Sequence, residues 1–104
     1  MMSDFDQLRQ RMKVWADARM PDRDIPGRLR KLGEESGEFS EAITRYMMDP
    51  TTDNAVEAGM EAADIALVLT DALDMMGLSL LHCMQMKIEV IEERPVEGFV
   101  EFKG

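Results

Sequence analysis

The sequence predicts an all-α fold, a bundle of about four helices whose core is completed by dimerisation. Apolar residues recur at helical spacing through most of the chain, and proline or glycine interrupts this spacing between segments. The apolar faces are also wide for a chain of 104 residues, which favours covering them with a second subunit. No repeat or long linker divides the chain, so residues 1–104 are interpreted as a single domain.

The first predicted helix covers residues 4–19 and follows a capping Ser3 or Asp4. Its apolar side chains recur at helical spacing, with charged residues between them: Phe5, Leu8, Met12 and Trp15. This register favours packing of Trp15 in the core or in a dimer interface over stacking on a nucleobase. A connector with two prolines, residues 20–26, then breaks the pattern before a second helix over residues 27–48.

The third predicted helix covers residues 54–76, after a turn that contains Pro50. Gly77 ends this helix, and Ser79 caps a fourth helix over residues 79–94, which Pro95 ends. The tail, residues 95–104, alternates apolar and polar residues, a pattern that fits either a short strand or an ordered extension.

The composition excludes several classes of function. Acidic residues outnumber basic ones by 21 to 12, giving a formal net charge of -9, which argues against binding to nucleic acid or to an anionic membrane surface. No apolar run approaches the roughly 18 residues of a membrane helix, and no signal-peptide core is present, so a cytoplasmic location is expected. A single cysteine and a single histidine give no basis for an internal disulfide or a zinc cluster.

Two pairs of carboxylates lie on the two central predicted helices, Glu35 with Glu38 and Glu61 with Asp64. The members of each pair are three residues apart, so they project from one side of their helix, and Glu34 adds a fifth carboxylate. Like charges this close repel one another, so a cation is expected to compensate them. Acidic residues at this spacing on one helix are usually only a solvated face, but two such motifs on two central helices favour a metal site.

The predicted cofactor is Mg²⁺, with Mn²⁺ as a substitute, because carboxylate oxygens are hard ligands. Helical bundles that hold iron pairs supply a Glu-x-x-His motif on two helices, whereas this chain has only His82. Mg²⁺ is usually held by a few protein carboxylates together with substrate phosphates. The acidic helix pair therefore indicates a di- or triphosphate ligand.

The acidic motifs resemble a known signature. Glu34-Glu35-Ser36-Gly37-Glu38, followed after 22 residues by Glu61-Ala62-Ala63-Asp64, is similar to the Glu-Glu-x-x-Glu and Glu-x-x-Asp motifs of the MazG-like, all-α nucleoside triphosphate pyrophosphohydrolases. The resemblance covers about residues 5–94. It implies Mg²⁺-dependent hydrolysis of a nucleoside triphosphate to the monophosphate and pyrophosphate, by a homodimer or tetramer.

The resemblance also implies roles for individual residues. The carboxylates that would bind Mg²⁺ are Glu35, Glu38, Glu61 and Asp64. Glu34 would help to bind a further metal ion or orient the attacking water, so the predicted catalytic residues are Glu34, Glu35 and Glu38. The basic residues expected to contact substrate phosphate are Lys31, Lys87 and Arg94, with Arg28 as a further candidate; the alternative for each is a solvated surface charge.

The last predicted helix departs from the family pattern. Many relatives carry a Lys-Asn pair after a lysine in this helix, and here Val90 and Ile91 replace that pair, although Lys87 and Arg94 match its frame. The departure favours an alternative function, a catalytically weak helical dimer that uses the acidic site to bind metal or nucleotide in a structural or regulatory role. No residue pattern specifies the base or the sugar of a nucleotide.

Overall fold

The computed structural model describes residues 2–94, and within this range the fold is all-α, as predicted. Four helices are described in this range: α1 (Asp4–Arg19), α2 (Ile25–Met48), α3 (Thr52–Met75) and α4 (Leu80–Glu92). The predicted strand or extension, residues 95–104, lies outside the described residues.

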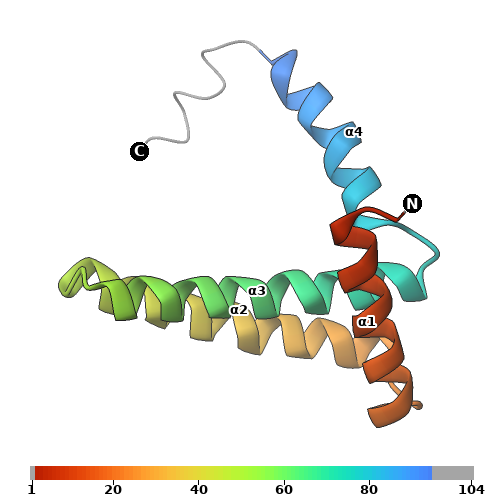
Figure 1. Cartoon of the computed structure of the whole chain (residues 1–104), viewed down its shortest axis with the longest axis horizontal. Coiled ribbons are helices and arrows are strands. Elements are labelled where there is room, and N and C mark those ends of the chain that lie inside the picture. Colours follow the sequence, from red (N-terminus) through yellow and green to blue (C-terminus); the bar gives the residue numbers. More distant parts are fainter. Residues whose placement is uncertain (1, 95–104) are drawn as a thin grey trace.

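Helices α2 and α3 form a long antiparallel hairpin, and most contacts between helices are made along it (Figure 1). Helix α1 crosses the end of the hairpin where α2 begins and α3 ends, and α4 leaves from the same end. The directions of α3 and α4 differ by 102°. Among residues 2–94, no single helix is long and apolar enough to cross a membrane, and α3 and α4 reach that length and composition only as a bent pair.

Each helix begins after a residue whose side chain accepts a hydrogen bond from a backbone N–H of the first turn: Ser3, Asp24, Thr51 and Ser79. Ser3 and Ser79 are caps that the sequence predicts. Helices α2 and α3 begin two residues earlier than predicted, at Ile25 and Thr52, because Asp24 and Thr51 serve as their caps. Gly77, with φ of 77°, allows the chain to turn sharply before α4.

The hydrophobic core of the single chain is small. The buried apolar residues are Ala16, Ala42, Ala58 and Val68, and no residue of α4 is buried. Trp15, expected in a core or an interface, is 49 % exposed in this chain. The radius of gyration is 16.3 Å, compared with about 13 Å for a compact domain of this length. The wide apolar faces predicted from the sequence are therefore largely uncovered in one chain.

A buried ion pair fastens the connector between α1 and α2 to α3. The guanidinium of Arg23 donates from Nε and Nη2 to the two carboxylate oxygens of Asp71, at 2.8 Å each. The Asp71 side chain has no exposed area, and Arg23 is 9 % exposed. Asp17 on α1 lies 3.0 Å from Arg23, so one guanidinium joins α1, the connector and α3. Asp71 raises the pKa of Arg23, which keeps this charge fixed.

Candidate metal centre

Three glutamates from the two central helices converge on one point. One carboxylate oxygen from each of Glu35, Glu38 and Glu61 lies within 4.8 Å of the others. Glu35 and Glu38 face α3 together because they are three residues apart on α2, and Glu61 meets them from α3. The convergence follows from the hairpin, which brings residues more than 20 positions apart side by side. This cluster is able to hold a metal ion.

Burial distinguishes the three carboxylates. Glu35 is 5 % exposed, Glu61 is half-buried and Glu38 is exposed. The Oε2 atoms of Glu35 and Glu61 are buried and have no hydrogen-bond partner within the described residues. A buried acceptor without a partner is costly, and a cation bound among these glutamates would offset that cost. The donor set contains only carboxylate oxygens, which suits a hard divalent cation.

The charges of the cluster act on one another. Glu35, partial loss of hydration and Glu61 together raise the pKa of Glu38 above its ordinary value of 4.5. Lys31, one turn before Glu35 on α2, places its Nζ 3.1 Å from Glu35 Oε1 and 3.6 Å from Glu34 Oε2. The ion pair with Glu35 raises the pKa of Lys31, so its ammonium stays charged at neutral pH. One ammonium thus compensates only part of the negative charge.

A cavity of about 440 Å³ lies next to the cluster, between α1, α2 and α3. Its polar lining comes from Arg28, Lys31, Glu35 and Asp64, and its apolar lining from Met12, Trp15, Met20, Leu67 and Val68. The Arg28 side chain is only 10 % exposed and its Nε has no hydrogen-bond partner within the described residues. The cavity therefore combines two cations, two carboxylates and an aromatic ring, and its volume is within the range of small-molecule sites.

The fourth and fifth predicted carboxylates lie beside the cluster. Asp64 is exposed and lines the cavity together with Glu35, but it is not one of the three converging residues. Glu34 has a side chain that is 66 % exposed, and it contacts the cluster through Lys31. The structure thus brings three of the predicted metal ligands together and leaves Asp64 and Glu34 at the edge.

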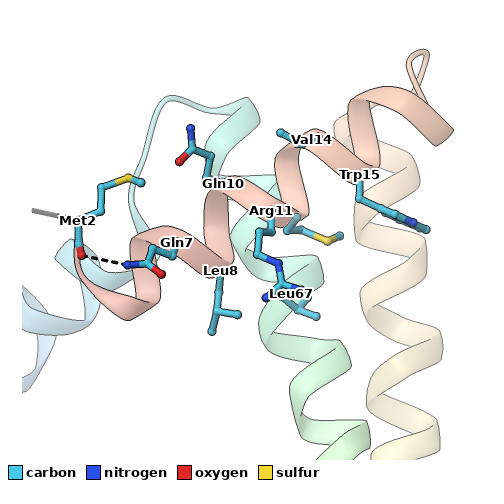
Figure 2. Close-up of a pocket in the computed structure, with 9 residues that line it drawn as sticks. Met2, Gln7, Leu8, Gln10, Arg11, Val14, Trp15 and Leu67 are labelled. Carbon is cyan, nitrogen blue, oxygen red and sulfur yellow. Dashed lines mark hydrogen bonds between the residues drawn. The ribbon is translucent and has the colours of Figure 1, made fainter.

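A groove on α1 continues from the cavity. It is lined mainly by α1 together with Leu67 of α3, and it shares Met12, Trp15 and Leu67 with the cavity. Figure 2 shows the Trp15 ring extending from α1 towards α2, with Leu8 on the same side of the helix and Val14 on another. Near the start of α1 the carbonyl of Met2 accepts a hydrogen bond from the side chain of Gln7. Trp15 therefore stands where the groove and the cavity meet.

The predicted phosphate ligands of α4 are not part of this constellation in a single chain. Lys87 is exposed and lines a separate apolar depression on α4, with Leu81, Met84, Gln85, Ile88 and Ile91. Arg94 is exposed just beyond the end of α4. Because α4 points away from the hairpin, the structure brings Lys31 and Arg28 to the cluster but not Lys87 or Arg94.

Sequence reasoning missed the ion pair that joins the connector to α3, next to Arg28 of the cavity lining. It treated residues 20–26 as a connector and did not identify Arg23 as the partner of Asp71. The sequence feature that could have drawn attention to Arg23 is its position between Asp22 and Asp24, in a connector that contains two prolines. A pair 48 residues apart leaves no local pattern, so the sequence alone gives no partner for it.

Comparison of the chain with family models, curated proteins and solved structures gave no significant match. The resemblance to MazG-like pyrophosphohydrolases therefore stays a prediction based on the two acidic motifs.

Proposed function

We propose that the protein is a Mg²⁺-dependent nucleoside triphosphate pyrophosphohydrolase of the MazG-like type. The observation that carries this proposal is the convergence of Glu35, Glu38 and Glu61 from two helices, with the Oε2 atoms of Glu35 and Glu61 buried and unpartnered. A solvated acidic face would leave its carboxylate oxygens in water. Buried acceptors on two facing helices instead favour a cation between them.

The ligand set favours Mg²⁺, with Mn²⁺ as a substitute, because it consists of carboxylate oxygens alone. When bound, Mg²⁺ would polarise the phosphate, lower the pKa of a coordinated water and neutralise charge on the leaving pyrophosphate. Glu35, Glu38 and Glu61 would hold the ion, and Asp64, which lines the adjacent cavity, would complete the set when substrate is present. Glu34, exposed beside the cluster, would orient the attacking water.

The cavity supplies the other contacts that a nucleoside triphosphate needs. Arg28 and Lys31 line it and would bind phosphate oxygens, Arg28 through a guanidinium that is nine-tenths buried. Trp15 lines the same cavity with about half of its area exposed, so this proposal assigns its ring to stacking on a base, in place of the packing that its helical register favours. In this proposal the residues on α1 contact the nucleoside and those on α2 contact the phosphates.

We further propose that the active form is a homodimer, or a tetramer built from two dimers. Helix α4 buries none of its residues, and its apolar side chains Met84, Met86, Ile88 and Val90 are each at least half exposed. Covering such a face stabilises a chain whose own core is small. Self-association through α4 would also give Lys87 and Arg94 a route to the phosphates bound by a second chain.

The alternative is a catalytically weak helical dimer that binds metal or nucleotide at the same cluster in a structural or regulatory role. Two observations favour it. Val90 and Ile91 replace the Lys-Asn pair of many relatives, and α4 points away from the cluster in the single chain. Both functions use the same glutamates, so only turnover separates them.

The deciding experiment is pyrophosphate release from a panel of canonical and modified nucleoside triphosphates, with Mg²⁺ or with chelator. The native chain is expected to release pyrophosphate only with Mg²⁺, and Glu38→Gln is expected to reduce release to background. Glu41→Gln, an exposed glutamate on the same helix outside the cluster, is the matched control and should retain activity. A folded native chain that binds Mg²⁺ but releases no pyrophosphate from any nucleotide would contradict the enzymatic proposal and favour the alternative.

A further inference from the structure

Lys31 lies where a cation would compensate the acidic cluster. Its Nζ is 3.1 Å from Glu35 Oε1, while Glu35 Oε2 is buried without a hydrogen-bond partner within the described residues. We propose that Lys31 is a counter-ion that a divalent cation displaces from Glu35, and that the released ammonium then binds the anion in the adjacent cavity. This inference rests on the proposed function, because it needs a metal ion at the cluster and a phosphate beside it.

The two partners differ in freedom to move. The Glu35 side chain is 7 % exposed and held between α2 and α3, whereas that of Lys31 is 44 % exposed. A lysine ends in a flexible four-carbon stem with a rotatable ammonium, so it can leave one acceptor for another at low cost. An ammonium and a divalent cation that both contact the Glu35 carboxylate would repel each other strongly. Lys31, rather than Glu35, is therefore the group that moves when a metal ion binds.

The released ammonium stays close to the site. Lys31 lines the cavity next to Arg28, and Asp64 lines the same cavity together with Glu35. The position on α2, one turn before Glu35, allows the side chain to reach either the cluster or the cavity. Lys31 thereby couples metal loading to anion binding, since the ammonium contacts the phosphate only after the metal has taken its place.

This coupling gives Lys31 opposite effects on two ligands. Removing its charge relieves the competition with metal but deletes a contact with the anion. A residue that merely supports the fold would weaken both kinds of binding when replaced. A solvated surface charge would act like Arg30, which lies one position earlier on α2 and forms no ion pair among residues 2–94.

The test is calorimetric titration of the native chain and variants with Mn²⁺, followed by titration of the loaded protein with the Mn²⁺ complex of pyrophosphate. Lys31→Gln is expected to bind Mn²⁺ about three- to fivefold more tightly, because the metal ion no longer has to break a partly exposed ion pair with Glu35. The same variant should bind the pyrophosphate complex about tenfold more weakly. Lys31→Arg, which keeps the charge, and Arg30→Gln should both bind Mn²⁺ within about twofold of the native chain.

The outcomes separate the inference from the function on which it rests. If the native chain binds Mn²⁺ and hydrolyses nucleotides, but Lys31→Gln behaves like Arg30→Gln, the counter-ion role is wrong and the enzyme stands. If Lys31→Gln weakens both Mn²⁺ and pyrophosphate binding, Lys31 has a structural role instead. If the native chain binds no Mn²⁺, the metal site fails and the role of Lys31 fails with it.

Discussion

The buried pair between Arg23 and Asp71 is predicted to be the strongest single polar anchor of the fold. Replacing Asp71 by alanine removes the two carboxylate oxygens to which Arg23 Nε and Nη2 donate at 2.8 Å, and leaves the guanidinium with Asp17 and the carbonyl of Met20. Arg28, with its Nη1 3.7 Å from the same carboxylate, also loses a negative neighbour. The variant would therefore leave two largely buried guanidinium groups near one another, and among residues 2–94 the half-exposed Asp17 would be the one carboxylate still paired with Arg23.

The expected cost follows from this burial. Breaking a buried ion pair by removing one partner costs about 3–5 kcal/mol, because the remaining charge stays desolvated. We expect Asp71→Ala to lose at least about 3 kcal/mol of unfolding free energy, since Asp17 offsets only part of the charge. For a domain of this size, 1 kcal/mol corresponds to about 4–8 °C in melting temperature. The melting temperature of Asp71→Ala should therefore fall by at least about 12 °C.

Thermal unfolding followed by circular dichroism measures this loss. The matched control is Glu57→Gln, which removes the ion pair between Glu57 of α3 and Arg45 of α2. This pair has a similar N–O distance, 2.7 Å, but both of its side chains are about half exposed. That control should lose less than about 1 kcal/mol. Arg23→Met combined with Asp71→Leu leaves neither charge of this pair and should recover most of the loss. A drop of less than about 4 °C for Asp71→Ala would refute the reasoning, as would a double variant no more stable than Asp71→Ala.

Three further predictions concern the site and the uncovered faces. Glu38→Gln should raise the melting temperature of the metal-free chain at neutral pH. Because the pKa of Glu38 is raised in the native state, ionisation of Glu38 lowers the stability of the native chain as pH rises above 4.5. The gain from Glu38→Gln should therefore vanish below pH 4.5, where the glutamate is protonated in both states. A gain that persists in acid would contradict this. Trp15→Leu should raise KM for the nucleotide about tenfold with little change in kcat, and an unchanged KM in steady-state kinetics would remove Trp15 from the site. Ile88→Glu should reduce the sedimentation coefficient to that of a monomer, and an assembly that persists would place the interface away from this face of α4.

Much of the fold could be predicted from local patterns. Helical periodicity, with predicted caps for α1 and α4 and with prolines and Gly77 as helix breakers, placed all four helices within two residues of their observed bounds, because these signals act over one or two turns. The direction of α4 could not be predicted in this way. Gly77 signals that α3 ends, but the 102° change of direction depends on how the following residues leave the turn. Trp15 is half exposed because α1 crosses only the end of the hairpin and leaves much of its apolar stripe uncovered, so its predicted packing in a dimer interface stays a prediction.

The candidate site could be predicted in part. The spacing of the acidic residues placed Glu35, Glu38 and Glu61 on the two central helices, and the structure brings these three together. Glu35 and Asp64 both lie about 60° from an apolar position of their helix, yet Glu35 is buried and Asp64 is exposed. A helical wheel gives the angle of a residue, but not which side the neighbouring helix covers. The contact between Lys31 and Glu35 could have been predicted from the sequence, since the two residues are one turn apart on one helix.

The position of a bound metal ion tests the central claim most directly. A crystal of the native chain soaked in Mn²⁺, with diffraction recorded at the manganese absorption edge, locates the ion independently of any activity. We predict an anomalous peak about 2.1 Å from carboxylate oxygens of Glu35, Glu38 and Glu61, with Lys31 Nζ withdrawn from Glu35. Soaked crystals without a peak at these glutamates, or with peaks only at other acidic residues, would contradict the metal centre and the pyrophosphohydrolase proposed from it.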